Sequence, residues 1–210
     1  MTDSMSAPNP ASRPSVPGSS PAETPASDAG REASPRLRAL VRAVTETEVH
    51  VAVSGWDQPV RVFALVRIAA AMEADPDVAG FLEAATVEEA RRDPELLMVV
   101  EQEGLPAAAD LEHLLAQLAW PESVHGVAIG IERLVLPSVA QEEADASTDA
   151  AERLAFLQAR PDREDIRMVV GVLRSGESWC ALRSRTHDDD ASIYQGEQLV
   201  PGLTLSLIHI

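Results

Sequence analysis

The spacing of apolar residues predicts a long helix near the start of the folded part of the chain. Ser34-Pro35 has the residue types of a helix N-cap followed by the first helical position. The apolar residues that recur at helical spacing after it are Leu37, Leu40, Val41 and Val44. We expect this helix to run to about Val53, because a glycine such as Gly55 is common just after the end of a helix.

Extended segments follow further along the chain. Ile166–Arg174 and Ser178–Arg185 are rich in β-branched residues and are separated by Ser175-Gly176-Glu177, which predicts an antiparallel hairpin with glycine in its turn. Val127–Leu136 alternates apolar and other residues, which predicts a third strand in the same sheet. The remaining strand candidates are Val60–Val66 and Leu96–Glu101.

Shorter helices separate these strands. We expect them over Ile68–Ala74, from the capping sequence at Thr86, from the cap at Asp110, and over residues 148–158 after a polar loop. The order of elements predicts an α+β fold, with a mostly antiparallel sheet and helices packed on one face.

Residues 1–34 differ in composition from the rest. They consist mainly of Ser, Pro and Ala and contain no aromatic residue, so they cannot bury enough apolar surface to offset the entropy of ordering. We therefore predict a disordered N-terminal tail over residues 1–34 and a single α+β domain over residues 35–204.

The charge of the chain excludes several functions. The formal net charge is −17 and all 17 basic residues are arginine, so we expect no nucleic-acid partner and no docking on anionic membranes. The absence of lysine excludes Schiff-base chemistry and the phosphate-binding lysine of P-loops. One cysteine, no leader sequence and no apolar run of about 20 residues predict a cytoplasmic protein.

The most concentrated group of polar side chains is His187-Asp188-Asp189-Asp190. An imidazole beside carboxylates makes these four residues weak candidates for a divalent metal site. The spacing of a calcium-binding loop is missing, however, and an acidic run after a strand is more often a solvated loop or a partner for nearby arginines. We expect no bound metal and no cofactor.

Trp179, Arg183 and Arg185 alternate along one predicted strand, so they share a face. Arginine with tryptophan can clamp an anion or a planar ligand, which makes these three possible ligand or partner contacts. Their commoner role is to protect a sheet edge and to pair with carboxylates. Between them, Cys180 points to the opposite face, as expected of a small buried residue.

Several motifs resemble those of an uncharacterised family of conserved hypothetical proteins from high-GC Gram-positive (actinobacterial) bacteria. The blocks that carry the resemblance are Gly55-Trp56-Asp57-Gln58-Pro59, Arg167–Arg174, Trp179-Cys180 and His187-Asp188-Asp189-Asp190. The resemblance covers nearly everything after the tail and implies no activity. Similar proteins continue past Leu203 into a helical segment, which differs from the end of this chain.

The last six residues read Leu205-Ser206-Leu207-Ile208-His209-Ile210. They match the translation of a sequencing-library adapter, so we interpret residues 205–210 as a non-native C-terminal artefact. On that interpretation they add nothing to folding, and removing them changes stability by less than about 0.5 kcal/mol.

The sequence contains no catalytic signature such as Gly-x-Ser-x-Gly or His-Glu-x-x-His. We therefore expect a non-catalytic protein-binding or regulatory module that acts through a protein partner. The alternative is a small-molecule or metal-assisted enzyme that uses His187, the three aspartates and the nearby arginines.

Overall fold

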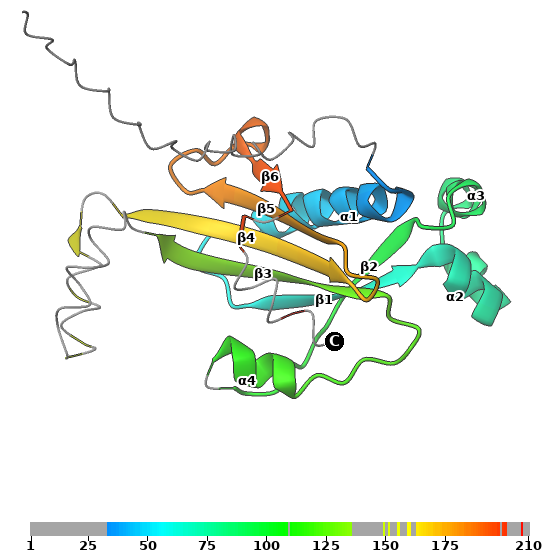
Figure 1. The fold of residues 1–210 in the computed structure, drawn as a ribbon, viewed down its shortest axis with the longest axis horizontal. Helices are drawn as coiled ribbons and strands as arrows, with labels where there is room; N and C mark the ends of the chain where they lie inside the picture. Colours follow the sequence, from blue (N-terminus) through cyan, green and yellow to red (C-terminus); the bar gives the residue numbers. More distant parts are fainter. Residues whose placement is uncertain are drawn as a thin grey trace, which may run out of the picture. The chain divides into compact units, whose positions relative to one another are not determined.

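A computed structural model describes residues 33–108, 110–135, 163–197, 199 and 200, together with 149, 151, 155, 159, 160 and 207 (Figure 1). The described residues belong to one compact unit that begins at Ala33. Nearly all of the predicted tail, and most of the loop and helix predicted between residues 138 and 158, lie outside the described residues.

The fold is built on a six-stranded sheet in which every neighbouring pair is antiparallel, in the order β2-β1-β3-β4-β5-β6. The predicted hairpin is confirmed as β4 and β5, whose turn contains Gly176 at φ 103°. The third predicted strand, β3, pairs with β4. The strands are β1 (Arg61–Arg67), β2 (Leu97–Glu101), β3 (Gly126–Val135), β4 (Glu164–Leu173), β5 (Ser178–Ser184) and β6 (Tyr194–Gly196).

The long helix α1 begins as the sequence predicts, because the Ser34 hydroxyl accepts a hydrogen bond from the Leu37 amide at 3.1 Å. Helix α3 begins two residues before the expected cap at Thr86, and Glu83 occupies its N-cap position. The helices are α1 (Pro35–Ala52), α2 (Ile68–Ala74), η1 (Pro76–Phe81), α3 (Ala84–Arg92), α4 (Leu111–Ala116) and η2 (Asp190–Ser192). No helix in the described part of the chain has the length and apolarity needed to cross a membrane.

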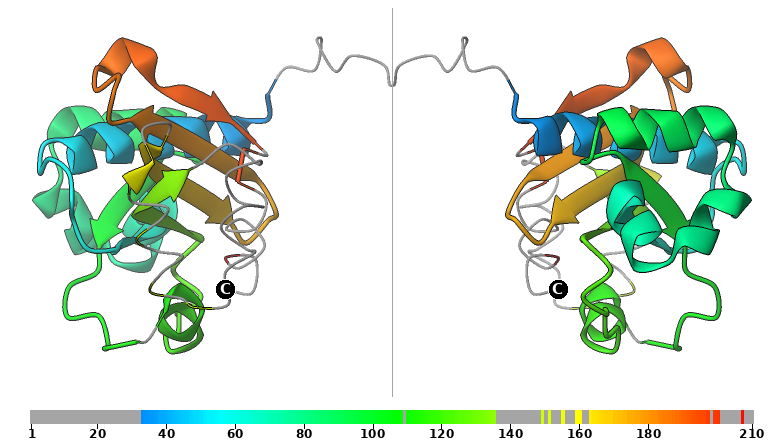
Figure 2. Two further views of the ribbon diagram at one scale, coloured as in Figure 1. Left: turned by 90° about the vertical axis from the view of Figure 1, so that its left-hand side faces the viewer. Right: turned by 90° about the vertical axis from the view of Figure 1, so that its right-hand side faces the viewer.

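Both faces of the sheet are apolar, and this decides where the helices pack. On one face, Leu40 and Val44 of α1 contact the buried side chains of the central strands, and a Cβ on Gly171 would lie 2.5 Å from Val44 Cγ2. On the other face, Leu114 of α4 belongs to a separate buried cluster. The α+β class and the antiparallel sheet are confirmed. The helices, expected on one face, lie on both (Figure 2), because β3 and β4 bury consecutive residues and so present apolar side chains to each face.

Leu207 is fully buried in the cluster on the α4 face, where the other members include Ile129 and Val170. Burying a leucine side chain stabilises a fold by about 1.5–3 kcal/mol. This burial does not fit the expectation that residues 205–210 add nothing to folding.

Candidate functional site

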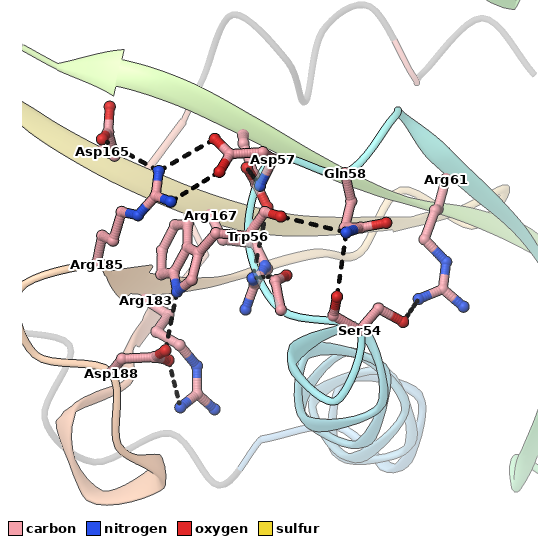
Figure 3. Close-up of polar contacts among 12 residues, drawn as sticks. Ser54, Trp56, Asp57, Gln58, Arg61, Asp165, Arg167, Arg183, Arg185 and Asp188 are labelled. Atoms are coloured by element: carbon pink, nitrogen blue, oxygen red, sulfur yellow. Dashed lines mark hydrogen bonds and ion pairs between the residues drawn. The ribbon is translucent and has the colours of Figure 1, made fainter.

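Charged side chains and one tryptophan from four parts of the chain gather at the end of the sheet where α1 finishes (Figure 3). Ion pairs and hydrogen bonds connect them. We call this group the arginine–carboxylate cluster, and its members are Glu48, Trp56, Asp57, Glu132, Arg167, Arg183, Arg185, Asp188 and Asp190.

The interior of the arginine–carboxylate cluster is a buried ion network. Glu48 lies on the core-facing side of α1 and is fully buried. Its carboxylate accepts hydrogen bonds from Nε and Nη2 of Arg183, both at 2.7 Å, and Arg167 Nη1 lies 3.9 Å from Glu48 Oε1. The hydrogen bonds to Glu48 raise the pKa of Arg183. A buried charge is tolerated only when it is paired and hydrogen-bonded, so these residues depend on one another.

Trp56 forms the outer part of the cluster. Its ring stacks against the guanidinium of Arg167, with 4.2 Å from Cζ to the ring centroid, and its Nε1 donates a hydrogen bond to Asp188 Oδ2 at 2.8 Å. Arg167 also donates a hydrogen bond to the carbonyl of Gly55. Trp56 thereby ties the loop after α1 to β4 and to the loop after β5 (Figure 3).

Asp57 completes the outer part from an unusual backbone conformation, with φ 64°. Its carboxylate accepts two hydrogen bonds from Arg185, at 3.1 and 2.7 Å, and these lower the pKa of Asp57. Its amide donates a hydrogen bond to Glu132 at 2.7 Å. Aspartate tolerates the left-handed region better than most residues, and here contacts on both sides hold it there.

The four residues predicted as a weak metal site do not converge. Asp188 and Asp190 face Arg183, with Asp190 accepting a hydrogen bond at 2.7 Å. Asp189 instead caps η2 by accepting from the Ala191 amide at 3.0 Å, and it also accepts from Ser192 Oγ at 2.7 Å. The Ser192 hydroxyl lowers the pKa of Asp189. The exposed His187 ring contacts the Thr186 hydroxyl at 3.1 Å. Among the residues described, no three or more His, Cys, Asp or Glu side chains are grouped to hold a metal ion.

The possible contact residues Trp179, Arg183 and Arg185 are also separated. Trp179 Nε1 donates to Gln195 of β6 at 3.2 Å, whereas both arginines belong to the arginine–carboxylate cluster. Trp56, rather than Trp179, stacks against an arginine of this cluster. Sequence periodicity could not identify it, because Trp56 lies in a loop 132 residues before Asp188. Cys180 is fully buried, as expected.

The arginine–carboxylate cluster has the properties of a structural tie. The carboxylates at its centre accept hydrogen bonds from arginines, so they already have strong donors and are poorly placed to act as acids or bases. A catalytic pair requires environments that push two pKa values apart. The hydrogen bonds from Arg185 lower the pKa of Asp57, so this carboxyl stays ionised. The contacts of the cluster hold the loop after α1 and the loop after β5 against the sheet.

A second candidate surface is the outer edge of β2, the terminal strand beside β1. Gln102 N donates to Val62 O at 2.8 Å and Ile68 N donates to Leu96 O at 3.0 Å. Because hydrogen-bonded and non-hydrogen-bonded pairs alternate in an antiparallel ladder, the bonds between these two points fall at Ala64–Val100 and Val66–Met98. The main-chain groups of the intervening residues point away from the sheet. We call this the open β2 edge, formed by Leu97, Val99 and Glu101.

Hollows flank the open β2 edge on both faces of the sheet. On the α1 face a hollow of about 350 Å³ is lined by His50, Phe63, Val99 and Glu101, among others. On the opposite face a hollow of about 290 Å³ lies beside Val100 and Trp120. The sequence Leu-Met-Val-Val-Glu contains no proline, lysine or arginine, the residues that usually protect an exposed edge. The other terminal strand, β6, is only three residues long.

The fold is thus an α+β sheet domain with an internal ion network and an open edge strand. The chain belongs to the PPA1309-like protein family, whose sequence model matches residues 28–209. This confirms the resemblance to an uncharacterised family. Neither the curated proteins nor the solved structures gave a match to the chain.

Proposed function

We propose that this chain is a non-catalytic protein-binding module that adds an extended segment of a partner protein to the open β2 edge. The observation that carries the proposal is the combination of outward main-chain groups at Leu97, Val99 and Glu101 with hollows on both faces of the same strand. In strand addition, main-chain hydrogen bonds supply affinity, and alternate side chains of the added strand enter pockets on the two faces.

The charge of the chain favours a basic partner segment. The chain carries a net charge of −17, and Glu103 follows β2 in the sequence, whereas Glu46 and Glu101 beside the open β2 edge are paired with Arg42 and Arg61. Opposite charge accelerates association, whereas two copies of this chain would repel one another. The proposed occupant is therefore an extended segment with apolar residues at alternate positions and with arginine or lysine beside them.

The arginine–carboxylate cluster supports this proposal indirectly. The alternative function, a small-molecule or metal-assisted enzyme, would use the side chains around His187 and the three aspartates. Asp188 and Asp190 instead neutralise Arg183, and Asp189 caps a helical turn. We propose that these residues stabilise the fold.

We also propose that the protein comes from a high-GC Gram-positive bacterium and works in the cytoplasm. Seventeen arginines without a lysine are typical of GC-rich coding, which favours a high-GC Gram-positive bacterium. A single cysteine, which is buried, fits the reducing cytoplasm. The partner would then be another cytoplasmic protein.

A library of displayed linear ten-residue peptides, selected on the immobilised full chain, tests the function. We expect peptides with alternating apolar residues and at least one arginine or lysine to be enriched. Val99→Pro removes a main-chain N–H that points outward while keeping the ladder with β1, and proline is tolerated at such edge positions. The selected peptides should lose binding to Val99→Pro.

Phe81→Ser is the matched control, because it removes an exposed apolar side chain outside the open β2 edge. It should bind the selected peptides like the wild type. Enrichment no greater than on an unrelated acidic protein, or equal binding to Val99→Pro, would contradict the proposal. A wild-type dimer in sedimentation equilibrium that Val99→Pro dissociates would assign the edge to a second copy instead.

A further inference from the structure

A small arginine-lined pocket lies at the end of the sheet opposite the arginine–carboxylate cluster. It has a volume of about 150 Å³, and its polar walls come from Arg36, Arg67, Glu95, His125, Arg174 and Ser175. The lining residues meet at one end of the sheet. There Arg67 at the end of β1 pairs with Leu97 at the start of β2, and β4 ends at Leu173. We call this the Arg36–Arg67 pocket.

The pocket is positive in a strongly negative protein. Three arginines against one glutamate give its walls a formal charge of +2 when His125 is neutral. Arg36 Nε lies 3.4 Å from Glu95 Oε2 and Arg67 Nη1 lies 3.7 Å from Glu95 Oε1, so both arginines share one carboxylate through loose ion pairs. One carboxylate cannot neutralise both cations.

The guanidinium groups of Arg36 and Arg67 lack hydrogen-bond acceptors among the described residues. Within the described part of the chain, neither side chain makes a hydrogen bond, and Arg67 Nε is buried with no acceptor. Arg183 is different, because it donates hydrogen bonds of 2.7 Å to Glu48. A buried donor without an acceptor is costly, and in native proteins it commonly indicates an ion or water.

The start of α1 adds to the positive potential. Arg36 and Arg38 lie in its first turn, which contains no acidic residue. Helix N-termini are already partly positive, so arginines there are unfavourable unless an anion lies nearby. His125 also lies in the wall, where its Nδ1 accepts a hydrogen bond from the Arg67 amide at 3.3 Å.

We propose that the Arg36–Arg67 pocket binds a phosphate-type oxyanion, either free or as the phosphate group of a small phosphomonoester. The donors are the guanidinium groups of Arg36 and Arg67, with Arg174 and His125 at the wall. Guanidinium forks match the oxygens of a tetrahedral anion, and Arg36 and Arg67 have donors that make no hydrogen bond among the described residues. Glu95 holds the two arginines in place and competes with the anion.

Isothermal titration of the full chain with inorganic phosphate, at fixed ionic strength in chloride, tests the site. We expect saturable binding of one phosphate. Arg36→Gln removes charge-assisted hydrogen bonds and should weaken binding about tenfold or more. Arg38→Gln loses the same charge from the same helical turn, outside the pocket lining, and should bind like the wild type.

Glu95→Gln gives a result that a purely structural role would not. Removal of the competing carboxylate should tighten phosphate binding by about tenfold, because one negative charge no longer repels the anion. Phosphate should also move the titration of the His125 ring to higher pH in NMR spectra, because a nearby anion favours the imidazolium.

Parallel titrations with glycerol 2-phosphate distinguish the two sources of the anion. Binding of both probes assigns the site to a small phosphomonoester, whereas binding of inorganic phosphate alone assigns it to the free ion. Absence of wild-type binding would overturn the proposal. Equal losses in Arg36→Gln and Arg38→Gln, or no gain in Glu95→Gln, would also overturn it, because the attraction would then be non-specific.

Discussion

The carboxylate of Glu48 and the guanidinium of Arg183 form a fully buried bidentate pair that joins α1 to β5, with both N–O distances 2.7 Å. Glu48 occupies a helical position where the pattern of Leu40 and Val44 would place an apolar residue. The pair gives the packing of α1 on the sheet a directional component, because an apolar contact would tolerate sliding that two charge-assisted hydrogen bonds do not.

Glu48→Gln should therefore destabilise the protein by about 3–5 kcal/mol, since it leaves Arg183 and Arg167 buried without their shared counter-ion. Urea unfolding followed by circular dichroism measures the change. Glu46→Gln, on the exposed side of the same helix, should cost less than about 1 kcal/mol. A Glu48→Gln protein as stable as the Glu46→Gln protein would show that the buried pair contributes no net stability.

Amide hydrogen exchange should alternate along β2. The N–H groups of Met98 and Val100 point to β1 and should exchange slowly, whereas those of Leu97, Val99 and Glu101 point outward and should exchange fast. NMR-detected exchange resolves single residues. Uniform protection along β2 would mean that another segment already covers the open β2 edge, which would exclude strand addition there.

The pKa values of two histidines should be displaced in opposite directions. Burial, followed by the charge of Arg67, lowers the pKa of His125, whereas the side chain of Asp110 raises the pKa of the exposed His113. NMR titration of the ring protons should place His125 below and His113 above the ordinary value near 6.5. The reverse order would contradict the burial of the His125 ring.

The lowered pKa of His125 has a consequence for stability. Folding favours its neutral ring, so its contribution is complete above the ordinary histidine pKa and is lost as pH falls through the lower folded-state value. His125→Gln should reduce the loss of stability between about pH 7 and pH 5, measured by urea unfolding. An unchanged pH dependence would count against this linkage.

The acidic residues after β5 should give no response to divalent ions. Asp188 and Asp190 already pair with Arg183, so added magnesium, manganese or calcium should leave the melting temperature unchanged. Replacement of both aspartates with asparagine should cost about 0–1 kcal/mol for each, because both carboxylates are exposed and Glu48 remains as a partner of Arg183. An ion-dependent rise in melting temperature that the double substitution abolishes would restore the metal-site hypothesis.

Leu207→Ala should destabilise the protein by about 2–5 kcal/mol, because it leaves a cavity in the cluster on the α4 face. Leu199→Ala, at a position that is 45% exposed, is the control and should change stability by less than about 1 kcal/mol. Thermal unfolding of both variants gives the comparison. Equal small effects would restore the expectation that residues 205–210 are dispensable.

Elements with local signals could be predicted from the sequence. The Ser34-Pro35 cap, the β4–β5 hairpin and the apolar alternation of β3 each depend on residues close together in the chain, so propensity and periodicity were sufficient. The burial of Cys180 followed in the same way from its position on a strand. The α+β class followed from the order of these elements.

Which distant residues meet depends on how the elements pack. Trp56 and Asp188 are 132 residues apart, and Glu48 and Arg183 are 135 residues apart, so no local pattern could pair them. The same holds for Arg36 and Arg67, which share Glu95 only because α1, β1 and the segment before β2 meet at one end of the sheet. Local propensity chooses each element, but the packing of α1 on the sheet and the order of the strands decide which charges are buried together and which edge is left open.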